Sequence, residues 1–139
     1  MSTAARAAFG LLVCATLAAF LVTQRLKHAP NAVQGFRLTP SFSPASAHGR
    51  RRERVSFRIA RTDDVTVSVL NSTDQAVATL ARSTHLRAYH RLSLSWDGRS
   101  DSGMPAPPGT YRLRVTLRRQ RRSVPAPRAF VLAPVPASG

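Results

Sequence analysis

The chain begins with one long apolar stretch and continues with a series of short alternating stretches. Residues 7–24 are 18 consecutive uncharged positions, mostly Ala, Leu, Val and Phe. At 1.5 Å per residue, a helix of this length spans about 27 Å, close to the hydrocarbon thickness of a bilayer. Arg6 precedes the stretch and Arg25 follows it. The pattern predicts a single transmembrane helix, an uncleaved signal anchor, over residues 7–24.

Two other interpretations of this apolar stretch remain open. A cleaved signal peptide also has a basic start and an apolar centre, but residues 20–24 contain no clear small-residue cleavage site. A buried globular helix would need a surrounding core, whereas the rest of the chain has the pattern of a self-contained β domain. The positive charges on the two sides of the stretch are nearly equal, so they do not decide its orientation.

From residue 36 onward, apolar and polar residues alternate with a period of two, which is typical of half-buried strands. The clearest runs are residues 55–59, 65–69, 92–96 and 111–118, and weaker candidates are 36–40, 76–81 and 129–133. Turn residues separate these runs, and no helical periodicity appears after residue 30. Short strands at regular spacing predict an all-β antiparallel β-sandwich of about seven strands.

These patterns divide the chain into five parts. They are a short N-terminal segment 1–6, the transmembrane helix 7–24, a linker 25–35, the sandwich 36–133 and a disordered tail 134–139. A length of 139 residues excludes a multidomain enzyme. The single cysteine, Cys14, excludes an intramolecular disulfide and a cysteine-based zinc site.

The loop after the 92–96 run carries residues with structural chemistry. Trp96 lies on the apolar face of its strand and is expected to anchor the core, while Asp97 can accept backbone N–H groups in the turn that it opens. A calcium site over residues 97–103 is disfavoured because Arg99 stands where an oxygen ligand is needed. Structural roles are expected for Trp96, Asp97, Gly98, Gly103, Gly109 and Tyr111.

Four segments in this order resemble a known family. They read DVTVSV at 64–69, QAVATL at 75–80, WDGRSDSG at 96–103 and PGTYRLRV at 108–115. Together they resemble the FlgD/Vpr-type Ig-like domain, the module of the flagellar hook-capping protein FlgD, over roughly residues 36–132. The resemblance implies an Ig-like fold of a kind that recurs in secreted and cell-surface proteins. Many relatives begin with an acidic loop, but residues 42–49 lack acidic side chains, so no metal is expected there.

Basic residues outnumber acidic ones by 21 to 6, which gives a formal net charge of +15. The candidate anion-binding residues are Arg50, Arg51, Arg52, Arg112, Arg114, Arg118, Arg119, Arg121 and Arg122. A basic stripe raises the local concentration of anions, although a solvated face that keeps the domain soluble is the alternative. Nucleic acid is the least expected polyanion because no aromatic residue interleaves with these arginines to stack bases.

The sequence contains no recognisable catalytic pattern. No serine lies in a Gly-x-Ser-x-Gly motif, and no glycine-rich phosphate loop precedes a helix. We therefore expect a non-enzymatic single-pass membrane protein without a cofactor or small-molecule substrate. It would use the bilayer as a partner through residues 7–24 and present its sandwich outside the cytoplasm, at the cell envelope, as a structural or protein-interaction module. The alternative is an electrostatic binder of anionic lipid or wall polymer.

Overall fold

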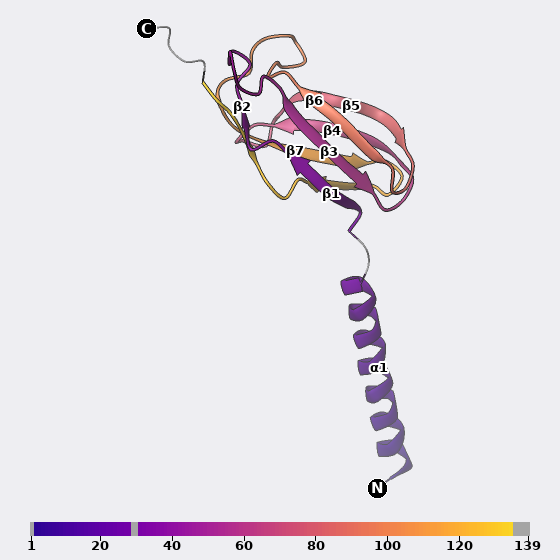
Figure 1. Cartoon of the computed structure of the whole chain (residues 1–139). Helices are drawn as coiled ribbons and strands as arrows, with labels where there is room; N and C mark the ends of the chain where they lie inside the picture. Colours follow the sequence, from indigo (N-terminus) through magenta and orange to yellow (C-terminus); the bar gives the residue numbers. More distant parts are fainter. Residues whose placement is uncertain (1, 29–30, 135–139) are drawn as a thin grey trace. The chain divides into compact units, whose positions relative to one another are not determined.

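The structure is a computed structural model that describes residues 2–28 and 31–134 (Figure 1). It divides into a helical unit, Met1–Asn31, and a β unit, Ala32–Gly139. The prediction of one long apolar helix followed by an Ig-like β-sandwich is confirmed. Each unit is described by itself below.

Helix α1 spans Thr3–His28 and begins directly after a capping serine. The Oγ atom of Ser2 accepts a hydrogen bond from the backbone N–H of Ala5 at 3.3 Å, which satisfies one of the free donors of the first turn. Farther along, the hydroxyls of Thr16 and Thr23 each donate to the carbonyl oxygen four residues earlier, at 2.8 Å. These two hydroxyls are therefore satisfied inside the helix itself.

The boundary between the helix and the first strand differs from the predicted linker 25–35. Helix α1 continues to His28 because no helix breaker occurs before Pro30. Strand β1, Val33–Leu38, begins earlier than the visible alternation because its register shifts at a bulge between Gln34 and Arg37. The predicted tail 134–139 lies outside the described residues apart from its first position.

The described part of the β unit contains nine strands in two sheets, whose two layers are visible in Figure 1. The small sheet has the order β1-β3-β6, with β3 at Glu53–Ile59 and β6 at Arg91–Trp96. The larger sheet has the order β2-β9-β7-β4-β5, and β8 pairs with β7. Its strands are β2 Ser41–Phe42, β4 Asp63–Leu70, β5 Ala76–Leu86, β7 Gly109–Leu117, β8 Arg122–Pro125 and β9 Phe130–Leu132.

Two strands, β2 and β8, have no counterpart among the predicted runs. Each is at most four residues long, which is too short for an alternating pattern to stand out. Strand β2 also pairs in parallel with β9, so the sandwich is not antiparallel throughout. This pairing joins Phe42 to Leu132, which are far apart in the sequence, and local pattern cannot reveal it.

The core lies between the two sheets and consists of the inward-facing residues of the alternating strands. The least exposed members are Val55, Phe57, Ile59, Val65, Val67, Val69, Leu113, Val115, Leu117 and Phe130. Two carboxylates, Glu53 and Asp63, are as fully buried as these apolar side chains. Buried carboxylates of this kind need hydrogen-bond partners, and the next section describes them.

Candidate functional site

Trp96 lies at the centre of an aromatic cluster between the sheets. It is 2% exposed, and its ring meets those of Tyr111, Phe42 and Phe130 edge-on, with centroids 5.1, 5.7 and 5.9 Å away. Its Nε1–H donates to the carbonyl oxygen of Arg99 at 2.8 Å. The indole therefore packs in the core and also closes the loop that follows β6.

The other predicted structural residues surround the same loop. Asp97 accepts the backbone N–H of Arg99 at 3.0 Å, and Gly98 and Gly103 have φ angles of +81° and +84°. A Cβ atom on Gly98 would lie 3.0 Å from the ring of Pro44, so this position has little room for a side chain. The Tyr111 hydroxyl donates to the carbonyl oxygen four residues earlier, in the manner of a tyrosine corner. Gly109 is the first residue of β7 and pairs with β9.

Asp101, which the sequence did not single out, attaches this loop to the edge strand β5. Its Oδ1 accepts the backbone N–H of Thr79 at 2.9 Å, and its own N–H donates to the carbonyl of Val77 at 3.1 Å. Both carboxylates of the loop are thus engaged by the protein. In the chain that the structure describes, no three His, Cys, Asp or Glu side chains gather as a metal site would require.

The predicted anion-binding arginines do not form one surface. Arg50, Arg51 and Arg52 are exposed just before the start of β3, whereas the arginines at 118–122 lie where β7 ends. Since Leu117 pairs with Val65 near the start of β4, just past the end of β3, the two clusters lie at opposite ends of the sandwich. The length of β3, about 23 Å, separates them. Arg112 and Arg114 face outward on the larger sheet.

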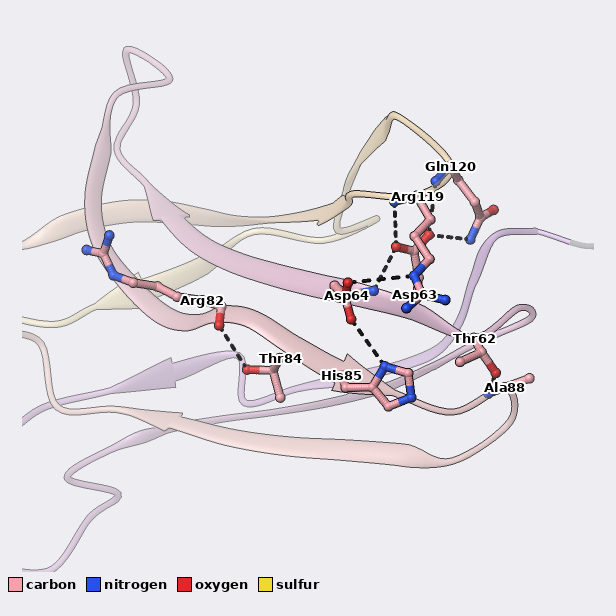
Figure 2. A network of polar contacts seen from close by, with 9 residues as sticks. All are labelled: Thr62, Asp63, Asp64, Arg82, Thr84, His85, Ala88, Arg119 and Gln120. Carbon is pink, nitrogen blue, oxygen red and sulfur yellow. Dashed lines mark hydrogen bonds and ion pairs between the residues drawn. The ribbon is translucent and has the colours of Figure 1, made fainter.

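Arg119 is bound within the protein by two acidic residues that begin β4 (Figure 2). The buried carboxylate of Asp63 accepts the backbone N–H groups of Asp64 and Arg119, both at 2.7 Å, and two N–H groups of Gln120, both at 3.1 Å. Asp64 lies 3.6 Å from Nε of Arg119 and 3.2 Å from Nδ1 of His85. The charge of Arg119 is therefore partly neutralised by Asp64, although its side chain is 61% exposed.

The hydrogen bonds to Asp63 also determine its charge state. Desolvation by burial raises the pKa of this carboxyl, but the N–H donors around it lower the pKa more, so the net shift is downward. Asp63 is therefore ionised, and its hydrogen bonds hold the turn between β7 and β8 in place. We call this arrangement the Asp63 clasp. The sequence signal was available, since two adjacent acidic residues at a strand start are unusual in so basic a chain.

The outer face of the small sheet carries arginines that lie outside the predicted anion-binding set. Arg37 on β1 pairs with Ser56, Arg54 on β3 pairs with Ser95, and Arg58 on β3 pairs with Arg91 on β6. We call this surface the arginine–serine face; its residues are Arg37, Arg50, Arg54, Arg58, Arg91, Ser56, Ser93 and Ser95. A hollow of about 560 Å³ lies on it. The arginines on the strands occupy the polar positions of the alternating pattern. In the sequence they cannot be distinguished from ordinary solvent-facing residues.

Glu53 is the second buried carboxylate, and the protein supplies it with few hydrogen-bond donors. Its Oε1 accepts the backbone N–H of Thr39 at 2.7 Å, while Oε2 has no hydrogen-bond partner among the described residues. Burial raises the pKa of Glu53 from 4.5 to about 7, although the Thr39 N–H and the charge of Arg50 oppose the shift. Glu53 therefore takes up a proton far more readily in the folded state than in the unfolded chain.

This shift predicts a pH dependence of stability. Because the folded pKa is raised, the stabilisation from protonated Glu53 is complete below pH 4.5 and is lost as the pH rises through about 7. The expected loss is about 3 kcal/mol of unfolding free energy. Denaturant unfolding of a fragment of residues 31–139 across this range measures it. Glu53→Gln, which cannot ionise, should flatten the profile, and an equally steep profile in this variant would contradict the assignment.

The match to a protein family agrees with the sandwich. The sequence model of the FlgD Ig-like domain family matches residues 46–121. No curated protein matches the chain. Similar solved structures include PorZ, a bacterial surface component of the type-IX secretion system of Porphyromonas gingivalis, which is 16% identical with a TM-score of 0.45. That match covers 72% of this chain and only 12% of the PorZ chain.

Two further structures are similar at the same level. The archaeal flagellum of Methanospirillum hungatei strain JF1 is 16% identical with a TM-score of 0.46, covering 94% of this chain and 92% of that one. Truncated FlgD of Helicobacter pylori is 12% identical with a TM-score of 0.45, covering 76% and 70%. The family match extends over more than half of the sequence, from the loop before β3 to the turn after β7. The chain belongs to the FlgD Ig-like domain family.

Proposed function

We propose that the protein is a non-enzymatic single-pass membrane protein that presents its Ig-like domain at the cell envelope as a structural or protein-interaction module. Membership of the FlgD Ig-like domain family supports the structural or interaction role. The loop around Trp96 is engaged in packing and hydrogen bonds rather than in a reactive arrangement. The anchoring part of the proposal rests on helix α1.

The observation that carries the anchor is the exposed apolar surface of α1. Its segment Thr3–Thr23 has a mean hydropathy of 2.0 and is 0% buried. Phe9, Leu11 and Phe20 are 63%, 73% and 59% exposed. A helix of this length spans about 31 Å, which matches the hydrocarbon core of a bilayer. The β unit has its own core, so the apolar surface of α1 is best accounted for by lipid. A signal sequence would share these features.

We place the β unit outside the cytoplasm. A short basic start followed by an apolar segment is the form of export signals and signal anchors. The balanced flanking charges do not oppose this orientation. The β unit contains no cysteine, so an oxidising compartment carries no risk of mispairing.

Fractionation of cells that express the full chain tests the anchor. We expect the intact protein in the membrane fraction, and protease added to wall-stripped intact cells should cut near residues 50–54 and 118–122. The matched control, Leu11→Arg with Leu17→Arg, should move the protein to the soluble fraction because two charges at this depth oppose insertion. A soluble mature form beginning between residues 18 and 31 would replace the anchor with a cleaved signal peptide. Cleavage only after lysis would place the domain in the cytoplasm.

A second candidate function is the binding of polyanions. The net charge of +15 favours it, together with the exposure of the arginines before β3 and on the small sheet. A field of one sign over a surface attracts oppositely charged partners from a distance.

A further inference from the structure

The arginine–serine face has no acidic residue on it. Of the six carboxylates, Glu53 points into the core, and Asp63 and Asp64 lie at the start of β4. The other three, Asp74, Asp97 and Asp101, lie in the loops that follow β4 and β6. Within the described residues, the arginines of this face form no ion pair with a carboxylate, whereas Arg82 and Arg119 elsewhere each do. The positive charge of the face is therefore uncompensated except at Arg50, whose charge acts on Glu53.

Every polar side chain of the face can donate hydrogen bonds. Arg91 is held in place by bonds from its Nη1 to the Gly35 carbonyl at 3.1 Å and to the Ser56 hydroxyl at 2.9 Å. The hollow is lined by the exposed Arg37, Arg50 and Arg54, with the hydroxyls of Ser56, Ser93 and Ser95 among them. Guanidinium groups bind phosphate oxygens in pairs, and serine hydroxyls add single bonds. This donor set is chemically suited to oxyanions.

The spacing of the face favours a repeating ligand over a single anion. Guanidinium and hydroxyl groups alternate along β3 as Arg54, Ser56 and Arg58, all on the outward side. Residues two apart on a strand are about 7 Å apart, so the two arginines are about 13 Å apart. A chain in which phosphates alternate with hydroxylated units would meet a cation and a hydroxyl in turn. A single phosphate would occupy only part of this surface.

The face is poorly suited to a bilayer or to bases. The strands β1, β3 and β6 expose no large apolar side chain that could enter lipid. The exposed Met104 and Val131 lie on other elements, and the exposed Tyr89 lies in the turn before β6. The one other aromatic side chain near the face, Phe36, is half-buried and packs on Phe57 with centroids 5.5 Å apart. Nucleic-acid binders that hold single strands use exposed aromatic rings to stack bases.

We propose that the arginine–serine face binds a polyol-phosphate polymer, with its phosphates on Arg37, Arg50, Arg54 and Arg58 and its hydroxyls on the serines beside them. This inference rests on the second candidate function and gives it a site and a ligand class. The arginines at 112–122 then contribute only long-range attraction.

Binding of labelled poly(glycerol phosphate) to the full chain in neutral detergent micelles, followed by fluorescence anisotropy, tests the site. The variant with Arg37→Gln, Arg50→Gln and Arg54→Gln should bind at least about 100-fold more weakly, because three charged contacts are removed. The matched control with Arg112→Gln, Arg118→Gln and Arg122→Gln removes the same charge and should stay within about threefold. Both should keep the wild-type melting temperature at pH 5, where Glu53 is protonated and does not depend on the charge of Arg50, since all six side chains are exposed.

The possible binding results distinguish a failure of the proposed site from a failure of polyanion binding as such. Equal losses in the two variants, or a loss in the control alone, would overturn the site while leaving polyanion binding in place. Absence of wild-type binding at low salt would overturn both. Tighter binding to single-stranded DNA, or to vesicles containing phosphatidylglycerol, would overturn the ligand class. Ser93→Ala with Ser95→Ala, which leaves the charge unchanged, should reduce the preference for poly(glycerol phosphate) over inorganic polyphosphate; an unchanged preference would contradict the role of the hydroxyls.

Discussion

Trp96→Ala is expected to lower the unfolding free energy of the β unit by about 3–5 kcal/mol, a large part of the total stability of a small domain. The truncation removes the ring that contacts Phe42, Tyr111 and Phe130 and leaves a cavity between the sheets. It also removes the donor to the Arg99 carbonyl, so the loop after β6 loses its closure. Denaturant unfolding of the fragment 31–139 measures the change.

The matched control for this prediction is Trp96→Phe. It keeps an aromatic ring in the cluster but removes the indole N–H, so it should cost clearly less than the alanine variant. A loss of under 1 kcal/mol for Trp96→Ala would mean that the side chain does not pack as the structure shows. Its exposure would then make it a candidate for binding a partner.

Asp63→Ala is expected to lower the unfolding free energy by about 3–4 kcal/mol. The carboxylate accepts four N–H groups from Asp64, Arg119 and Gln120, and its removal leaves several buried donors without a partner. The turn between β7 and β8 depends on these bonds, so hydrogen exchange at residues 118–121 should accelerate first. Equilibrium unfolding and exchange rates measure the two effects.

The neighbouring residue supplies the control for Asp63. Asp64 is half-buried and makes an ion pair at 3.6 Å with Arg119 and a hydrogen bond at 3.2 Å with His85, both exposed, so Asp64→Ala should cost under about 1 kcal/mol. Because the pKa of Asp63 is lowered in the fold, its stabilisation is present above its ordinary pKa of 3.8 and is lost as the pH falls below it. The unfolding free energy of Asp63→Ala should therefore no longer fall in this way below pH 3.8. An unchanged fall in this variant would contradict the Asp63 clasp.

Glu53 and Asp63 show that burial alone does not determine the charge of a carboxylate. Both are 0% exposed, yet the pKa of one rises and that of the other falls. Asp63 accepts four hydrogen bonds, whereas Glu53 accepts one and leaves Oε2 without a partner. The number of donors, which depends on segments distant in the sequence, decides the sign.

Local pattern was sufficient for the elements of this fold. Strands β3, β4, β6 and β7 alternate because one face of each is buried, and this alternation depends only on neighbouring residues. The apolar run of α1 is similarly self-evident. The turn at Asp97 and Gly98 also follows from local chemistry, because a short carboxylate and a residue with positive φ form it without help from the rest of the chain.

Local sequence therefore predicts the helix, the main strands, the inward residues and the core position of Trp96. The folded chain adds the parallel pairing of β2 with β9, the clasp of Asp63, and the attachment of Asp101 to β5. It also separated the two arginine clusters predicted from the sequence and assembled a third group across β1, β3 and β6. Periodicity depends on adjacent residues, so it can be recognised in the sequence. The neighbours of a charged side chain depend on strand register, because register brings together residues that no local pattern connects.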